Sequence, residues 1–246
     1  MLIGAEEEKR MDKLYIVMPA YNEAENIEEV VKEWYPVLEG KDENSRLVIA
    51  DGGSKDNTLE ILYKLQKTYP KLEVFSKPGT DHGTKLIFLY DYAIKTGADY
   101  IFQTDSDGQT RPDEFDQFWK MRNTYDAILG NRTKREDGQS RAFVENVLRL
   151  ILRIYFGAKT PDANAPFRLM KADVVKKYIY RLPEDFNLPN ALLAAYFSVF
   201  KENVKYVEIT FRPRQGGKNY INVKRIIGIG WGSLKNFYKL RKELYK

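Results

Sequence analysis

The chain has 246 residues, with 40 Lys and Arg against 35 Asp and Glu, a single His and no Cys. A chain of this length can bury a core without disulfides or a structural metal. The absence of Cys excludes a disulfide scaffold, a Cys-ligated metal site and a thiol nucleophile. The single His82 excludes a multi-His metal site and leaves one candidate base for a Ser-His-Asp hydrolase.

The first half of the chain alternates between short β-rich runs and stretches of helical periodicity. The expected strands are Leu14–Met18, Leu47–Ala50, Leu72–Ser76, Tyr100–Thr104 and Ala127–Leu129. The expected helices are Ala24–Tyr35, Thr58–Thr68, Lys85–Thr96 and Asp113–Arg122. Strand–helix alternation with short connections predicts an α/β fold with a mostly parallel sheet and helices on both of its faces.

The pattern changes after about residue 135. We expect a polar loop at Lys134–Arg141, an apolar helix at Phe143–Phe156 and a loop at Gly157–Pro166. A helix at Asn190–Phe200, a strand at Tyr206–Phe211 and a basic helical C-terminal region should follow. We interpret residues 1–135 as a ligand-binding half and residues 136–246 as an acceptor-side region of the same globular domain.

Charge is unevenly distributed along the chain. Residues 212–246 hold ten basic residues and one acid, a net charge of +9, whereas residues 1–211 carry −4. Apolar residues interleave with Lys and Arg in this basic tail, a pattern that fits contact with an anionic membrane and equally fits a helix packed on the domain. No run approaches the roughly 18–20 apolar residues of a spanning helix, and the acidic N-terminus lacks a signal-peptide core. We therefore expect a cytoplasmic protein, soluble or peripheral at the inner membrane face.

Acidic and turn-forming residues follow three of the expected strands. In open parallel sheets ligands bind beyond the carboxyl ends of the strands. Asp105 and Asp107 follow a run that reads as a buried strand, and two carboxylates at such a bend can share Mg²⁺ or Mn²⁺, with Gln109 as a further oxygen ligand. The alternative is an Asp-rich turn that only caps a strand.

The ends of the first two strands also have structural interpretations. Asp51 lies at the end of its strand and is a candidate for contact with a base or ribose, whereas Asp56 fits a helix N-cap. Glu23 and Glu25 fit a helix N-terminus as well as a ligand site. The chain lacks the glycine-rich fingerprint of a Rossmann dehydrogenase, a P-loop and a nucleophile elbow.

Three segments together resemble one enzyme family. They are MPAYNEAENI from Met18, ADGGSKDNT from Ala50 and TDSDGQ from Thr104. Their order and spacing resemble the nucleotide-sugar half of the family 2 glycosyltransferases, which are inverting enzymes of the Rossmann-like GT-A fold, over about residues 13–135. Segments around Asn131, Asp162–Arg168 and Arg212–Lys218 resemble, more loosely, the branch of dolichyl- and polyprenyl-phosphate sugar synthases.

The resemblance implies roles for individual residues. Pro19, Tyr21, Glu23 and Asp51 would hold the nucleotide of a nucleoside-diphosphate sugar. Asp105, Asp107 and Gln109 would hold the metal, with Asp105 also close to the donor. The residues that would meet phosphates are Arg132, Arg168, Arg214 and Lys218. This chain departs from the family pattern at Gly52, where relatives often carry a second acid, and in the loop at Gly79–Lys85.

The acceptor decides whether a general base is needed. A hydroxyl needs one, and the candidates are Asp185 first, then Asp162, Glu184 and His82, because relatives carry an acidic base in the region of Asp185. A lipid phosphate is already ionised, and Arg212, Arg214 and Lys218 would position it. The sequence thus predicts metal-dependent, inverting sugar transfer to a polyprenyl-phosphate or other lipid-linked acceptor.

Three alternatives stay open. The first is transfer to a saccharide hydroxyl in polysaccharide synthesis. The second is a sugar-nucleotide nucleotidyltransferase, which should carry a glycine-rich loop after the first strand. The third is a non-enzymatic basic module that binds a membrane or nucleic acid in a salt-sensitive way. The acids at the strand ends argue against the third, and we expect no nucleic-acid partner.

Overall fold

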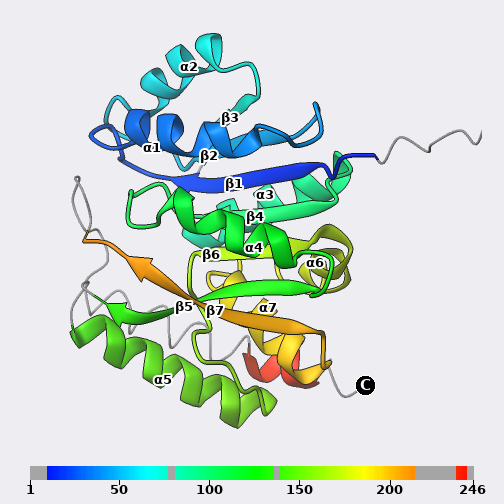
Figure 1. Cartoon of the computed structure of the whole chain (residues 1–246). Helices are drawn as coiled ribbons and strands as arrows, with labels where there is room; N and C mark the ends of the chain where they lie inside the picture. The colour runs from blue at the N-terminus through cyan, green and yellow to red at the C-terminus, as the bar shows by residue number, and fades with distance from the viewer. Residues whose placement is uncertain (1–9, 77–80, 136–138, 214–236, 243–246) are drawn as a thin grey trace, which may run out of the picture.

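The computed structural model of the chain describes residues 10–76, 81–135, 139–213 and 237–242. Its centre is a seven-stranded sheet in the order β3-β2-β1-β4-β6-β5-β7 (Figure 1). The strands are β1 Leu14–Ala20, β2 Arg46–Asp51, β3 Leu72–Ser76, β4 Tyr100–Thr104, β5 Ala127–Arg135, β6 Phe167–Lys171 and β7 Val204–Phe211. The prediction of a mostly parallel sheet is confirmed.

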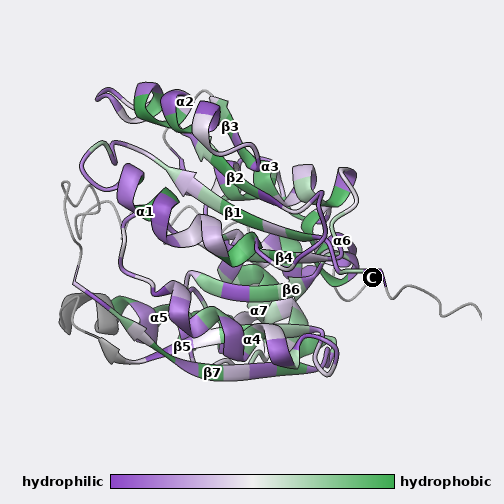
Figure 2. Ribbon diagram, turned by 45° about the horizontal axis from the view of Figure 1, so that its top comes forward, coloured by the Kyte–Doolittle hydropathy of each residue, from purple (hydrophilic) through white to green (hydrophobic). Residues whose placement is uncertain are grey.

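Helices cover both faces of this sheet (Figures 1 and 2). The α-helices are α1 Ile27–Trp34, α2 Thr58–Thr68, α3 His82–Lys95, α4 Phe115–Met121, α5 Gln139–Phe156, α6 Ala172–Ile179 and α7 Pro189–Val199. Two 3-10 turns extend this set, Tyr35–Leu38 after α1 and Pro112–Glu114 before α4. Residues 237–242 are helical, and the remainder of the predicted basic C-terminal region lies outside the described residues.

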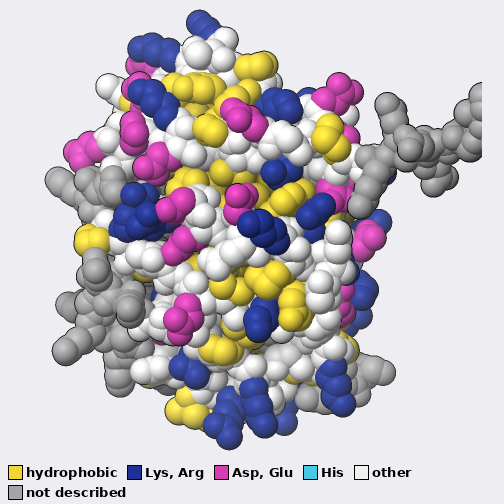
Figure 3. Space-filling view, in the orientation of Figure 1, with side chains coloured by type: hydrophobic (Ala, Val, Ile, Leu, Met, Phe, Trp, Pro, Cys, Tyr) yellow, Lys and Arg dark blue, Asp and Glu magenta, His cyan; other side chains and the backbone are white. Residues whose placement is uncertain are grey.

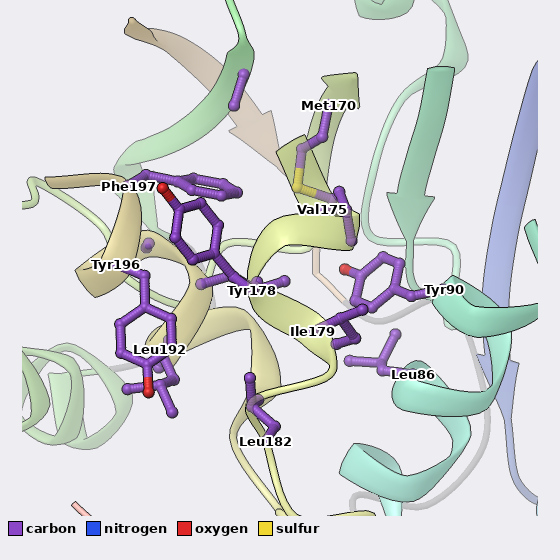
Figure 4. Packing of buried hydrophobic residues seen from close by; sticks show 14 of the residues in the cluster. Leu86, Tyr90, Met170, Val175, Tyr178, Ile179, Leu182, Leu192, Tyr196 and Phe197 are labelled. Atoms are coloured by element: carbon purple, nitrogen blue, oxygen red, sulfur yellow. The ribbon is translucent and has the colours of Figure 1, made fainter. Parts of the chain in front are cut away.

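The alternation of side chains along β1 divides the core into two layers. Leu14, Ile16 and Met18 pack with α1, α2 and α4 on one face of the sheet. Tyr15 and Val17 pack with α3, α5, α6 and α7 on the other face. Both sets are buried, so β1 is apolar on both faces, as a central parallel strand has to be. Figure 4 shows how α3, α6 and α7 meet in the second layer.

The second half of the chain departs most from the expected elements. We predicted neither β6 nor α6, which follow directly after the Gly157–Pro166 loop. β6 inserts between β4 and β5 and runs antiparallel to both. The strand pairs Arg168 with Gln103, and a buried Arg at that place hides the apolar pattern of a strand. Strands from both halves of the chain thus belong to one sheet.

The described part of the chain contains no helix that is long and apolar enough to cross a bilayer. The helix α7 is the most apolar of the described helices by sequence. It is only 11 residues long, and its residues from Pro189 to Phe197 are buried. Its apolar character therefore reflects a position inside the fold.

Candidate functional site

The loops after β1 and β2 are tied to each other at the carboxyl edge of the sheet. The Gly52 N–H donates to the Ala20 carbonyl over 2.9 Å, and the Glu23 N–H donates to the Thr58 hydroxyl over 2.8 Å. Asn22 adopts a left-handed backbone with φ 53°, a conformation that Asn tolerates better than most residues. Its side chain accepts from the Lys55 N–H over 2.7 Å. The predicted nucleotide-binding loops therefore form one connected rim.

Asp51 is fully buried at the end of β2. One carboxylate oxygen accepts from the N–H groups of Gly53 at 2.9 Å and Ser54 at 3.0 Å, and the other accepts from the Ser54 hydroxyl. Gly53 has φ +78°, which a side chain would strain. These contacts make Asp51 the organiser of the turn. Its predicted contact with the nucleotide stays a prediction.

The residues predicted to bind the nucleotide at the end of β1 lie at different depths of the same sheet edge. Pro19 is within β1, and its carbonyl accepts from the Ser106 hydroxyl over 2.9 Å. Glu23 is only 6% exposed and accepts from the Asn26 side-chain amide over 3.0 Å. The Tyr21 ring lies next to the Lys85 ammonium, 5.6 Å from Nζ to the ring centroid. Of these, Tyr21 stands next to a charged group that suits a nucleotide phosphate.

The Asp-Ser-Asp segment after β4 alternates between surface and interior. Asp105 and Asp107 are partly exposed, whereas Ser106 between them is buried against Pro19. The Gln103 side-chain amide donates to Asp105 over 3.2 Å, and the Gln109 N–H donates to Asp107 over 3.2 Å. The segment thus presents two carboxylates at the sheet edge from a backbone that the buried serine fixes.

These two carboxylates suit a hard divalent cation, because carboxylate oxygens are the ligands that Mg²⁺ and Mn²⁺ prefer. Among the described residues, no group of three or more acidic or His side chains converges on one point. Gln109 was predicted as a further oxygen ligand. Its amide nitrogen donates to the Arg212 carbonyl over 2.9 Å, and the role of its side-chain oxygen stays a prediction. Nucleotide phosphates and water would complete the coordination.

Gln109 and Arg212 connect the site loop to the end of β7. The Arg212 N–H donates back to the Gln109 carbonyl over 2.8 Å. The Arg212 guanidinium donates to Glu33 over 3.2 Å and to the Thr110 carbonyl over 3.0 Å. Arg212 is thus engaged with α1 and the β4 loop. Arg214 and Lys218, the other predicted phosphate ligands of this segment, lie outside the described residues.

A buried lysine at the start of α3 is the site residue that the sequence analysis missed. Lys85 is 3% exposed, and its ammonium donates to the Ala20 carbonyl over 2.8 Å. Burial lowers the pKa of Lys85 to about 8, although the charges of Asp51, Asp105 and Glu23 oppose this shift. A Lys followed by apolar residues in a helical pattern gave no signal. Only its position under the β1 loop identifies it.

The loop that carries Glu184 and Asp185 packs against the first turn of α3, which lies at the same edge of the sheet. Gly83, in the first turn of α3, lies so close to this loop that a Cβ there would stand 2.1 Å from the Phe186 carbonyl oxygen. His82 precedes it and lies 3.8 Å from Asp105. Asp185 and Glu184 are both exposed, and Phe186 anchors them in the core. The structure therefore brings the Asp185 segment alongside the α3 end that borders Asp105.

Arg132 and Asp162 form a buried ion pair. The guanidinium donates to both carboxylate oxygens over 2.7 and 2.9 Å, and the two side chains are 8% and 4% exposed. Glu145 of α5 lies 3.7 Å from the same guanidinium and accepts from the Ala163 N–H over 2.8 Å. The predicted donor ligand and the predicted base thus contact one another.

Arg168 does not fit the predicted role as a phosphate ligand. It is 0% exposed in β6, and its guanidinium donates to the carbonyls of Ala163 at 3.1 Å, Ala165 at 3.1 Å and Asn190 at 2.9 Å. Burial lowers its pKa. Because the side chain is fully buried and donates to these three carbonyls, it holds the Asp162 loop and α7 against the sheet.

The described site therefore has two groups of residues. The donor-side group lies at the ends of β1, β2 and β4 and the start of α3, and it contains Asp105, Asp107 and Lys85. The second group contains Arg132, Asp162 and Glu145, between β5 and α5. Asp105, Asp107, Arg132 and Asp162 were predicted to contribute to one reaction, whereas Lys85 and Glu145 were not predicted.

Known proteins resemble this chain in sequence and in fold. Residues 15–179 match the family model described as glycosyl transferase family 2. A dolichyl-phosphate beta-glucosyltransferase of Trichomonas vaginalis is 28% identical over 134 residues, which cover 50% of this chain and 41% of that protein. The chain thus spans less than half the length of this curated relative.

Solved structures share the fold at low identity. Glucosyl-3-phosphoglycerate synthase of Mycobacterium tuberculosis, in complex with Mn²⁺ and UDP-glucose, superposes with a TM-score of 0.68 at 16% identity, covering 94% of this chain and 79% of that one. TarS of S. aureus, in complex with UDP-GlcNAc, gives a TM-score of 0.60 at 15% identity, with 88% and 64% covered. These likenesses confirm the GT-A fold. The family match covers well over half of the sequence, and the chain therefore belongs to glycosyl transferase family 2.

Proposed function

We propose that this glycosyltransferase moves a sugar from a nucleoside-diphosphate sugar to a phosphate-bearing acceptor, with a divalent metal and with inversion at the anomeric carbon. One observation carries the donor half of this proposal. Asp105 and Asp107 present two partly exposed carboxylates at the end of β4, where the α3 terminus with Lys85 also lies. The two carboxylates would bind the metal ion and the Lys85 ammonium would bind a phosphate. Together they would bind the diphosphate group of the donor with its metal.

Asp105 and Asp107 would hold the metal. Mg²⁺ or Mn²⁺ bound there would neutralise the charge that develops on the diphosphate leaving group. The Mn²⁺ and UDP-glucose complex of the mycobacterial synthase supports both the metal and a uridine nucleotide as first choices for testing. Glu23 and Asp51, both buried, would support the nucleotide through the loops that they order.

Lys85 would contribute a cation on the nucleotide side of the leaving group. Its ammonium already sits beside the Tyr21 ring and under the Ala20 carbonyl. A buried ammonium has lost much of its hydration, so an incoming phosphate gains more from it than from an exposed lysine. Because of the same burial, Lys85 loses its proton above about pH 8 when no donor is bound.

The choice of acceptor rests on the relatives. The Trichomonas protein is named for dolichyl phosphate, and the mycobacterial synthase is described in complex with phosphoglyceric acid. Both acceptors carry a phosphate, so we propose an acceptor of that class and favour a polyprenyl phosphate. Its ionised oxygen would attack without a base, and the basic segment from Arg212 would position it.

A saccharide hydroxyl is the second candidate acceptor, and the exposed Asp185 favours it. Asp185 is solvent-accessible and lies on the loop that packs against Gly83, close to the start of α3. Asp162 is the weaker candidate for a base, because the Arg132 guanidinium occupies both of its oxygens. A hydroxyl acceptor would therefore make Asp185 the residue that removes the proton.

The donor half is tested by the thermal stability of the protein with nucleotides. UDP, GDP, dTDP and CDP are each added with Mn²⁺, with Mg²⁺ or with EDTA, because a ligand stabilises by mass action. We expect one diphosphate to raise Tm only when a metal is present. Asp107→Asn should abolish this shift, whereas Asp113→Asn, at an exposed acid of the neighbouring 3-10 turn, should retain it. A full shift in EDTA would exclude the metal role.

The acceptor half is tested separately with the stabilising donor. Transfer of radiolabelled sugar is compared for dolichyl phosphate, 3-phosphoglycerate and a neutral oligosaccharide. Product with a phosphate acceptor that persists in Asp185→Asn supports the first proposal. Product with the oligosaccharide alone, lost in the same variant, would favour the hydroxyl acceptor.

A further inference from the structure

The helix α5 carries apolar side chains on two opposite faces. On the inner face, Leu152 is fully buried and Phe156 is 2% exposed. On the outer face Val147, Leu150 and Ile154 are 39%, 56% and 63% exposed. These three residues are spaced three and four apart and therefore lie along one line of the helix. We call them the α5 stripe. The helix that the sequence predicts at Phe143–Phe156 is therefore apolar on an exposed face as well as on its buried face.

A basic hollow flanks the α5 stripe. It has a volume of about 560 Å³ and lies between α5 and the loop that follows it. Its lining includes the cationic side chains Arg149, Arg153 and Lys159 together with Asn146 and Leu150, and among the described lining residues there is no acid. The Arg149 guanidinium is held by the Thr160 carbonyl at 2.9 Å. Figure 3 shows Lys and Arg side chains gathered along the lower edge of the molecule, where α5 and β7 lie in Figure 1.

The inner face of α5 explains why the helix cannot simply turn its stripe inward. Glu145 contacts Arg132 and the Ala163 N–H, while Leu152 and Phe156 pack in the core. The orientation of the helix is therefore fixed by one ion pair and by apolar packing. The outer stripe is a constant feature of the surface and needs an apolar environment of its own.

We propose that α5 docks the protein onto an anionic phospholipid surface. Val147, Leu150 and Ile154 would enter the acyl boundary, and Arg149, Arg153 and Lys159 would meet lipid phosphates at headgroup level. An apolar line with cations beside it is the arrangement that binds at such an interface. The charge selects this occupant, because all the charged residues among the described lining of the hollow are cationic. Three side chains also fall far short of the roughly 800 Å² per partner of a stable protein interface.

This docking would affect the candidate site because α5 contacts the site on one side and carries the α5 stripe on the other. Glu145, on the opposite side of the same helix from Leu150, contacts the Arg132–Asp162 pair. A protein that rests on α5 would therefore hold the second group of site residues near the headgroups. The inference concerns membrane binding alone and stands without the proposed sugar transfer.

The test is co-sedimentation of the full chain with vesicles of equal parts phosphatidylcholine and phosphatidylglycerol. Leu150→Ser with Ile154→Ser should lower the partition coefficient at least about tenfold, given the apolar area withdrawn from the boundary. Arg153→Gln with Lys159→Gln should lower it about 30-fold, since each cation near an anionic surface contributes roughly a fivefold factor. Vesicles of phosphatidylcholine alone should bind the wild type weakly.

Matched variants separate docking from general effects. Tyr63→Ser removes a large exposed side chain, 45% exposed, from α2, and Lys67→Gln with Lys120→Gln removes the same charge from α2 and α4. Both should bind like the wild type. Far-ultraviolet circular dichroism checks that every variant is folded. Equal binding of the α5 and control variants would overturn the proposal. So would light scattering that shows a dimer which the α5 changes dissociate.

Discussion

Replacing Lys85 with Met should stabilise the protein and weaken its affinity for a nucleoside diphosphate. The ammonium of Lys85 is buried under the β1 loop, and burial lowers its pKa from 10.5 to about 8. Each pKa unit corresponds to about 1.4 kcal/mol between the charged and neutral forms. At pH 7 the buried charge therefore destabilises the fold by about 3 kcal/mol. Met has a similar length and no charge, so it removes this penalty.

The net gain is smaller because one hydrogen bond is lost. The Lys85 ammonium donates to the Ala20 carbonyl, and leaving that carbonyl without this donor costs about 1 kcal/mol. We therefore expect K85M to raise the free energy of unfolding by about 2 kcal/mol at pH 7. For a chain of this size that corresponds to a rise in Tm of roughly 4–8 °C.

The pH dependence gives a sharper test than the sign of the change. Between pH 8 and 10.5 the unfolded chain keeps the Lys85 proton and the folded chain loses it, so wild-type stability rises with pH in this window. Below pH 8 both states hold the proton and the penalty is constant. The advantage of K85M should therefore shrink by about 2 kcal/mol from pH 7.5 to 9.5.

Urea denaturation at these two pH values measures both effects. Lys67→Met, at an exposed position of α2, is the control and should leave the stability and its pH dependence unchanged. Thermal shift with UDP and Mn²⁺ then measures the loss of affinity. A K85M protein that is less stable than the wild type, or whose advantage does not vary with pH, would refute the argument.

Three further changes have defined outcomes. Gly83→Ala places a Cβ 2.1 Å from the Phe186 carbonyl and should destabilise by about 2–3 kcal/mol in urea, against about 1 kcal/mol for Gly40→Ala, which has φ +65° and open space. Arg168→Met removes the guanidinium donor from three carbonyls and should cost about 3 kcal/mol by the same measurement; a stable variant would contradict its structural role. Asp185→Asn should lower kcat for a hydroxyl acceptor about 100-fold or more and leave the UDP shift intact, with Glu184→Gln as the control.

The first half of the fold was predictable because local pattern and tertiary role agree there. β3, β4 and α2 coincide with the predicted Leu72–Ser76, Tyr100–Thr104 and Thr58–Thr68. Their side chains follow the period of the element that they form, and turns rich in Gly, Asp and Asn separate them. The DSD segment was also placed correctly at a strand end, since an apolar run followed by acids has few other interpretations in a parallel sheet.

The second half was less predictable because tertiary contacts override the local pattern. β6 has Arg168 at its centre, where the carbonyls of Ala163 and Ala165 in the preceding loop and of Asn190 in α7 accept from the guanidinium. Lys85 likewise looks like an ordinary helix residue until the β1 loop covers it. The local sequence shows neither that the loop before β6 turns its carbonyls toward Arg168 nor that α7 and the β1 loop pack against these cations. Buried cations of this kind are found only from three-dimensional contacts.

The Arg132–Asp162 pair changes how the two candidate bases compare. Its carboxylate is almost fully buried and receives two guanidinium hydrogen bonds, so taking up a proton would break a buried ion pair. Breaking such a pair costs about 3–5 kcal/mol, which a general base would have to meet in every turnover. Asp185 is exposed, so its protonation would not break a buried ion pair. The pair fixes the Asp162 loop against β5 and α5. This is why our proposal places base chemistry at Asp185 for a hydroxyl acceptor, and at no residue for a phosphate acceptor.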